Sequence, residues 1–411
     1  MKKLLSAKQL TWLMTLVYFT SYVTRINFGA IIQEVVTDTG FLKSELSIVL
    51  VGLSVFYGAG QLITGVLGDR VPPHLLIGGG LACAAIINLL FPLASESRIL
   101  MCILWSCNGF CHAMMWPPLT KIMATTMDRK MYEYAVVRVS WGSSFGTIAI
   151  YLLAPLVLSF SGWRTVFLVC GVIGVGTSIL WFLMARYINY PPVEEAITSD
   201  ASPRKKKGGL GGQFFLPIAL IMLSIALQGM IRDGVTAWMP TYLSEVFAMQ
   251  NSVSILSTVS LAIFSIVSFW AVGLMFDRFF KSEVFCAAIM FGLAALTAGV
   301  FYLFYDAGAI LAILLMTLMT GLMHGVNLVL IGYVPKHFRN VGKVSTVSGL
   351  LNSCTYVGAS ISTYGVARIA EVMGWRFNIL VWLIVTAVGC VVCLCAVRPW
   401  KRAEASMHME E

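Results

Sequence analysis

The chain has 411 residues, of which 58% are apolar and only 11% are charged, and its mean hydropathy is +0.85. Soluble domains carry about 25% charged residues, so this composition excludes a soluble protein and indicates one that lies in a membrane. The formal net charge is +9. Because the basic residues gather in the predicted connections between helices, we attribute this charge to membrane orientation and expect no nucleic-acid partner.

Apolar runs separated by charged or proline-containing turns predict an all-α membrane protein of twelve transmembrane helices, each with the roughly 20 residues that a span needs. In chain order the predicted helices cover residues 10–32, 46–67, 75–94, 99–120, 134–158, 164–187, 215–243, 252–275, 284–305, 307–331, 343–370 and 374–397. The first run contains Arg25 and extends to about Ile32, which makes it too long for a cleaved signal peptide.

A polar segment with paired prolines and the basic run 204–207 separates the first six predicted helices from the last six. We therefore expect a six-helix bundle at 1–189, a cytoplasmic linker at 190–214 and a second six-helix bundle at 215–411. If both termini and the linker are cytoplasmic, 21 of the 28 lysines and arginines lie on that side. Positive charge is retained in the cytoplasm, so we expect a multi-pass protein of the cell inner (plasma) membrane with this orientation.

The residue types that carry enzymatic chemistry are not grouped at reactive spacing within the predicted helices. Most of the ten cysteines lie in apolar runs, and Cys390, Cys393 and Cys395 have no histidine or carboxylate at ligand spacing. No nucleophile or carboxylate pair stands out either. We therefore expect no metal, no cofactor and no enzymatic activity.

Several short motifs occur twice, at separations of 207 to 212 residues, which identifies the two halves as duplicates. The recurring pairs are Asp69-Arg70 and Asp277-Arg278, Gly162-Trp163-Arg164 and Gly374-Trp375-Arg376, His112 and His324, and Arg25 and Arg232. Parallel repeats about an axis along the membrane normal describe the major facilitator superfamily. The segments 65–70 (GVLGDR) and 273–278 (GLMFDR) also resemble the cytoplasmic loop signature of that superfamily.

In physical terms, an aspartate beside a helix end and a nearby arginine can lock a cytoplasmic gate through charge-assisted contacts. We therefore assign a gating role to Asp69, Arg70, Asp277 and Arg278; the alternative is a solvated turn.

Arg25 and Arg232 lie at matching depth, roughly 22 to 26 Å along the first helix of each half at about 1.5 Å per residue. A central arginine costs about 2.5 to 3.5 kcal/mol to insert, so the pair indicates a function. Two planar guanidinium forks suit a phosphate, and an anion held by both would draw the halves together, which favours exchange. The alternative is structural pairing with Asp233 or Glu34. We expect Asp233 not to neutralise Arg232, because neighbouring helical residues point about 100° apart.

Three segments, 22–28 (YVTRINF), 116–118 (WPP) and 232–243 (RDGVTAWMPTYL), together resemble the organophosphate:phosphate antiporter family. This resemblance implies that Arg25 and Arg232 bind the phosphate group of the substrate. Where that family has cationic or titratable side chains, this chain has Ile26, Gln61 and Ser143 or Ser144. The substrate is therefore expected to differ in charge or shape from the substrates of that family.

Polar residues on the same predicted helices complete the candidate binding site. We include Gln61 as a hydrogen-bond donor and Asn352 with Tyr356 as polar contacts, and the resemblance adds the residues Tyr18, Tyr22, Tyr57 and His324, with His112 as the repeat mate of His324. Asp233 and His324 are the candidate protonation sites. Arg138 is expected to extend to the cytoplasmic interface.

The leading hypothesis is a monomeric transporter that exchanges a small phosphorylated solute for inorganic phosphate by alternating access. Its partners are a small-molecule anionic substrate and membrane lipid. A second hypothesis is a proton-coupled symporter of an organic carboxylate or sulfonate that uses Asp233 or His324. A third is a transporter-like sensor of sugar phosphate.

Overall fold

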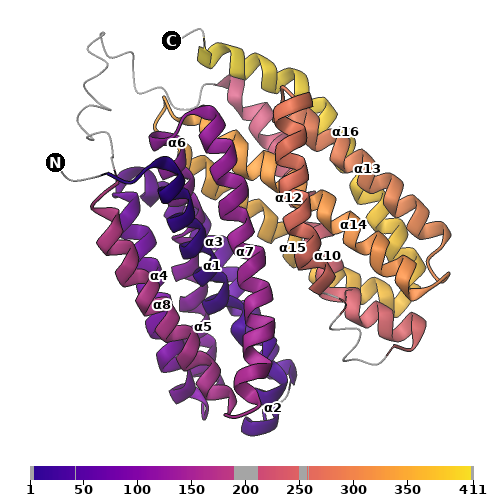
Figure 1. Cartoon of the computed structure of the whole chain (residues 1–411). Coiled ribbons are helices and arrows are strands. Elements are labelled where there is room, and N and C mark those ends of the chain that lie inside the picture. The colour runs from indigo at the N-terminus through magenta and orange to yellow at the C-terminus, as the bar shows by residue number, and fades with distance from the viewer. Residues whose placement is uncertain (1–3, 42, 189–211, 250–256, 258, 409–411) are drawn as a thin grey trace. The chain divides into compact units, whose positions relative to one another are not determined.

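The computed structural model describes residues 4–41, 43–188, 212–249, 257 and 259–408, and this part of the chain is helical with no β-strand (Figure 1). Contacts between residues divide the chain into two compact units. Unit 1 comprises Met1–Met123, Lys130–Ile188 and Phe338–Tyr356, and unit 2 comprises Ala124–Arg129, Asn189–His337 and Val357–Glu411. The predicted linker lies mostly outside the described residues, so the boundaries drawn at 189 and 215 stay predictions.

The helices of the N-terminal half agree with the first six predicted spans. They are α1 (Ala7–Ala30), α2 (Ile32–Thr39), α3 (Lys43–Arg70), α4 (Pro73–Leu90) with the short η1 (Phe91–Ala94), α5 (Arg98–Ala113), α6 (Trp116–Thr126), α7 (Arg129–Leu158) and α8 (Trp163–Ala185). The predicted span 99–120 is divided into α5 and α6, because Pro117 and Pro118 lack the N–H groups that would continue the helix.

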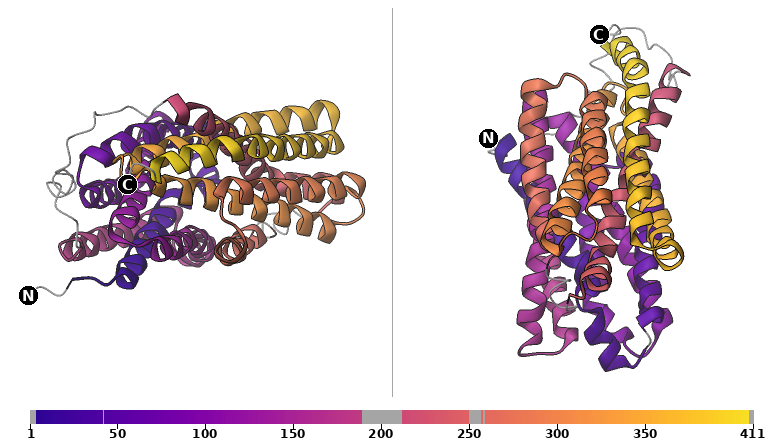
Figure 2. Two further views of the ribbon diagram at one scale, coloured as in Figure 1. Left: turned by 90° about the horizontal axis from the view of Figure 1, so that it is seen from above. Right: turned by 90° about the vertical axis from the view of Figure 1, so that its right-hand side faces the viewer.

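The C-terminal half repeats the pattern. It contains α10 (Gly212–Phe247), α12 (Val259–Phe279), α13 (Glu283–Leu303), α14 (Ala309–Asn327) continued by η2 (Leu328–Tyr333) and η3 (Val334–Phe338), α15 (Val344–Met373) and α16 (Trp375–His408). The second view of Figure 2 shows the long helices of this half running side by side along their lengths.

Ten of the described helical segments are long and apolar enough to cross a membrane, and α1 and α15 are not among them. Both are long enough, but their polar side chains, including Arg25 on α1 and Asn352 on α15, lower their hydropathy. Polar residues within a membrane bundle face protein or water rather than lipid. The two helices that the apolar criterion omits are therefore those that carry much of the candidate site.

Glycines on α7 let the backbone of α1 approach closely within unit 1. A Cβ atom at Gly142 would lie 2.6 Å from the carbonyl oxygen of Thr15, and one at Gly146 would lie 2.6 Å from that of Phe19. Small residues four apart are typical of close helix contacts in membranes. This contact fixes α1, and with it the segment that carries Arg25.

The two halves repeat one hydrogen bond that the sequence did not reveal. In unit 1 the indole of Trp163 donates to Asp38 Oδ2 at 2.9 Å, and Arg164 donates to the same oxygen at 2.8 Å. In unit 2 the indole of Trp375 donates to Glu245 Oε2 at 2.7 Å. Asp38 and Glu245 are 207 residues apart, as Arg25 and Arg232 are, so the duplication extends to these acids.

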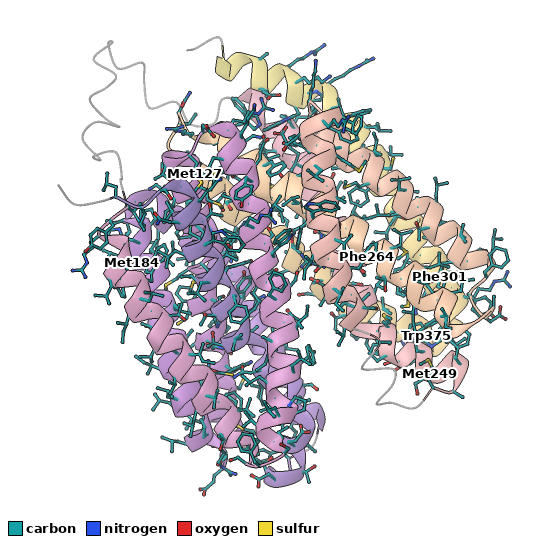
Figure 3. The ribbon with its side chains drawn as sticks, viewed as in Figure 1. Met127, Met184, Met249, Phe264, Phe301 and Trp375 are labelled. Atoms are coloured by element: carbon teal, nitrogen blue, oxygen red, sulfur yellow. The ribbon has the colours of Figure 1, made fainter. Side chains whose placement is uncertain are left out.

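Aromatic packing accompanies the hydrogen bond of Trp375. The rings of Phe301 and Trp375 lie 5.6 and 5.4 Å from the ring of Tyr242, and Figure 3 shows both at the same end of unit 2.

Candidate functional site

Arg25 on α1 lies in a group of tyrosines and is only 8% exposed. Its guanidinium carbon is 4.1 Å from the ring centroid of Tyr22 and 4.8 Å from that of Tyr57 on α3. Cation–π contacts of this kind contribute about 0.5 to 2 kcal/mol each. Within the described residues Arg25 forms no salt bridge with a carboxylate, and Glu34 is exposed on α2. The tyrosine faces stabilise the cation without neutralising its charge.

Further aromatic rings extend this group, all within unit 1. The Tyr18 ring lies 5.3 Å from that of Tyr22 and 5.2 Å from that of Trp116, and the Tyr57 ring lies 4.6 Å from that of Tyr356 on α15. The structure thus brings together the predicted residues Tyr18, Tyr22 and Tyr57 around Arg25. Asn352, one turn before Tyr356, is 8% exposed and forms no hydrogen bond through its side chain within the described residues.

Three buried asparagines fix the backbone next to Arg25, and they were not among the predicted site residues. Asn88 on α4 and Asn108 on α5 both donate to the carbonyl oxygen of Thr24, at 2.9 and 3.1 Å. Asn27 on α1 donates to Asn88 Oδ1 at 2.7 Å. Hydrogen bonds between helices satisfy polar groups that lipid cannot solvate, so these amides hold α1 in place at the depth of the arginine.

Gln61 on α3 occupies a structural position. Pro117 cannot donate to the carbonyl oxygen of Ala113, which would be its helical partner. That oxygen instead accepts a hydrogen bond from Thr64 Oγ1 at 2.7 Å and a longer one from Gln61 Nε2 at 3.4 Å. The remaining Gln61 oxygen is buried and has no hydrogen-bond partner among the residues that the structure describes. A contact between Gln61 and an anion stays a prediction.

Each repeat places its histidine near its arginine. His112 is fully buried, shares a 3.0 Å hydrogen bond with Ser21 of α1 through Nδ1, and interacts electrostatically with Arg25. His324 on α14 interacts electrostatically with Arg232, and its ring centroid lies 5.3 Å from that of Phe269. The two histidines therefore belong to the surroundings of the arginines, and proton coupling through His324 stays a prediction.

Arg232 on α10 has a different environment, and here the prediction from the sequence was wrong. Its Nε donates to Asp233 Oδ1 at 2.7 Å and its terminal nitrogen donates to Oδ2 at 2.9 Å, a bidentate pair of adjacent residues. The 100° rotation between neighbouring helical residues sets only the directions of their Cα–Cβ bonds. The long arginine side chain can therefore bend back to reach the short aspartate. The two arginines thus differ, because Arg25 has aromatic faces and Arg232 has a carboxylate.

The predicted gate residues lie at helix ends. Asp69, near the end of α3, accepts hydrogen bonds from the backbone N–H groups of Ser345 and Thr346 at 3.0 and 2.8 Å, and from the Thr346 hydroxyl at 2.5 Å. These groups form the first turn of α15, where a negative charge is stabilising. A Cβ atom at Gly68 would lie 2.0 Å from Ser345 Oγ and 2.9 Å from Ser345 Cβ, so a larger residue here would force Ser345 to shift.

The end of α3 is also bound by a lysine. Lys121 of α6 donates to the carbonyl oxygens of Gly68 and Asp69, at 2.8 and 3.2 Å. Arg70 ends α3 and is exposed, and Asp277 and Arg278 lie in the last turn of α12. The charge-assisted contact of Asp69 is therefore made to a helix N-terminus rather than to an arginine. The gating role of all four residues stays a prediction, as does the convergence of Arg25 and Arg232, which lie in different units.

Comparison with known proteins gives the chain its context. The family model described as Major Facilitator Superfamily matches residues 14–363. A glycerol-3-phosphate transporter of Bacillus subtilis is 28% identical over 84% of this chain and 81% of its own length. A membrane sensor protein, UhpC, of Salmonella typhimurium is 23% identical over 96% and 91%, and a probable hexose phosphate transport protein of Chlamydia pneumoniae is 22% identical over 87% and 84%.

Solved structures agree on the fold. The crystal structure of the transporter FucP in the outward conformation matches with a TM-score of 0.74 at 12% identity, over 94% of this chain and 98% of that one. The structure of the proton:xylose symporter XylE matches with a TM-score of 0.68 over 94% of both chains. The fold class and the resemblance predicted from the motifs are confirmed, and with them a multi-pass membrane transporter fold rather than an enzyme. The chain belongs to the major facilitator superfamily.

Proposed function

We propose that the protein exchanges a small phosphorylated solute for inorganic phosphate across the cell membrane, with Arg25 and Arg232 binding the phosphoryl group. The observation that carries this proposal is a buried arginine, Arg25, whose charge is stabilised by tyrosine rings and neutralised by no carboxylate of the described residues. Such a group favours an anionic ligand in the membrane interior. Relatives named as transporters of glycerol phosphate and hexose phosphate support the ligand class.

Exchange follows from the cost of an empty site. Without a ligand, the charge of Arg25 has no counter-ion among the described residues, whereas a bound anion is attracted by the guanidinium groups of both repeats. Conformational change is then favoured when the site is loaded, and each transport step requires an anion. In this proposal the termini and the linker are cytoplasmic. The two repeats move against each other, so that the site opens alternately to the two sides of the membrane.

Proteoliposomes loaded with inorganic phosphate test the proposal. We expect uptake of labelled glycerol 3-phosphate or glucose 6-phosphate without a proton gradient, and no uptake into vesicles that lack internal phosphate. Arg25→Lys retains the charge but loses the planar fork, so it should reduce uptake strongly. Uptake that needs a proton gradient and ignores internal phosphate would contradict the proposal.

That contrary result would support a second candidate function, proton-coupled symport of an organic anion, which the carboxylate of Asp233 beside Arg232 favours. A third candidate is a sensor, since one relative is named a membrane sensor protein. Binding of a sugar phosphate with no flux in either assay would support it.

A further inference from the structure

The net charge around Arg25 differs from that around Arg232, although the two arginines occupy equivalent positions in the repeats. In unit 2 both oxygens of Asp233 bind the guanidinium of Arg232, at 2.7 and 2.9 Å. The Arg232 and Asp233 side chains are 15% and 30% exposed, so neither is fully solvated. The pair contributes no net charge to its surroundings. In unit 1 Arg25 contributes a full positive charge.

Any anion that binds Arg232 must share the guanidinium with Asp233. The carboxylate is attached to the neighbouring residue, so its effective concentration at Arg232 is in the millimolar range or higher. An anion that displaces the Asp233 carboxylate from Arg232 does not remove its charge, because the carboxylate stays on the same turn of α10. A bound anion is therefore repelled by Asp233, and the repulsion grows with the charge of the anion.

We infer that Asp233 sets the valence of the transported anion, so that the site selects a singly charged tetrahedral ligand over a doubly charged one. This inference rests on the proposed function, in which Arg25 and Arg232 bind the same ligand. Two guanidiniums and one carboxylate sum to a single positive charge, which a singly charged anion neutralises. A doubly charged phosphate ester would leave one uncompensated negative charge in a medium of low dielectric constant, which is unfavourable.

Other titratable groups near the arginines do not alter this balance at alkaline pH. His324 of α14 interacts electrostatically with Arg232, and His112 of α5 interacts with Arg25. Ordinary histidine is neutral above about pH 7.5. At pH 8 these histidines are therefore uncharged, and the charges that we count at the site are those of the two arginines and Asp233.

Methyl phosphate and methyl sulfate are suitable probes, because they have nearly the same shape and differ in charge. Above its second pKa of about 6, a phosphate monoester carries close to two negative charges, whereas a sulfate ester carries one. Binding of each to the purified full-length protein in detergent is measured by calorimetry at pH 8. We expect the parent protein to bind methyl sulfate at least as tightly as methyl phosphate.

The variant Asp233→Asn removes the charge and should shift the ratio of the two affinities toward methyl phosphate by at least about tenfold, since unit charges a few ångströms apart interact strongly at an effective dielectric constant of about 20. Asp233→Glu keeps the charge and should keep the parent ratio. Asp306→Asn removes an exposed acid of unit 2 that lies outside α10 and should also keep it. Asp233→Ser is a second neutral variant should the asparagine variant fail to fold.

The inference would be overturned if the ratio of the two affinities were unchanged in the neutral variants. If those variants bound both esters more weakly by the same factor, the role of Asp233 would instead be to position Arg232. If no folded form of the protein binds either ester, the proposed function fails, and this inference fails with it. The two failures can be distinguished. Failure of the inference is seen as an unchanged affinity ratio while the parent protein still binds methyl phosphate or methyl sulfate, whereas failure of the proposed function is seen as no binding of either ester.

Discussion

Replacing Gly142 of α7 by alanine should destabilise the protein, whereas the same change at Gly79 of α4 should not. A Cβ atom at this position would lie 2.6 Å from the carbonyl oxygen of Thr15 and 3.1 Å from the backbone nitrogen of Phe19, well inside normal contact. Both atoms belong to backbone and cannot rotate away, so α1 has to move. Forced overpacking of this kind costs about 1 to 3 kcal/mol.

A matched control separates this clash from helix propensity. Alanine is favoured over glycine in a helix by about 0.5 to 1 kcal/mol, and a Cβ at Gly79 of α4 would meet nothing within 4 Å. Gly79→Ala should therefore be neutral or stabilising, and Gly142→Ala should be destabilising. Thermal unfolding of the two purified variants in detergent measures the difference.

The same displacement should reach the candidate site. Gly146, one turn further along α7, would place a Cβ 2.7 Å from that of Tyr22, whose ring contacts Arg25. Gly146→Ala should thus weaken phosphate ester binding as well as stability. Equal unfolding temperatures for Gly142→Ala and Gly79→Ala would refute the close contact between α1 and α7.

Two further predictions concern charged groups at helix ends. Hydrogen bonds from the Trp163 indole and from Arg164 lower the pKa of Asp38, so its contribution to stability is complete above its unfolded pKa of about 3.9 and is lost as the pH falls through the lower folded value. The stability advantage of the parent over Asp38→Asn, measured by thermal unfolding against pH, should therefore begin to shrink below about pH 4 and continue to shrink as the pH falls further. An advantage that stayed constant across this acidic range would contradict the reasoning. Asp69→Asn leaves one acceptor oxygen for three donors of α15, so hydrogen exchange at Ser345 and Thr346 should accelerate about fivefold for a loss of about 1 kcal/mol, whereas Asp306→Asn should not change it.

The sequence predicted the fold well, because a span of about 20 apolar residues is dictated by the thickness of the membrane. The repeat spacing also placed Arg25, His112 and their mates in equivalent positions. The tyrosines around Arg25 were predicted through the family resemblance, and the structure brings Tyr18, Tyr22 and Tyr57 together.

What the sequence could not predict depends on side-chain reach and on contacts between distant segments. Asp38 and Glu245 resemble ordinary surface acids, and only their 207-residue spacing could have indicated their tryptophan partners. The pairing of Arg232 with Asp233 was considered as an alternative and wrongly rejected, because helical geometry constrains the first bond of a side chain and not its end. The acceptor left by Pro117, which Thr64 and Gln61 share, follows from the proline rule but needs the fold to name its partners.

The central claim is that Arg25 and Arg232 bind one anion. Calorimetric titration of the purified protein with methyl sulfate and methyl phosphate tests it most directly, on the parent and on the variants Arg25→Gln and Arg232→Gln. We expect one site per chain in the parent, and a loss of at least about thirtyfold in affinity in each variant, since removing one partner of a buried charged contact costs about 2 kcal/mol or more. Binding at the parent affinity in either folded variant, or two independent sites per chain, would contradict it.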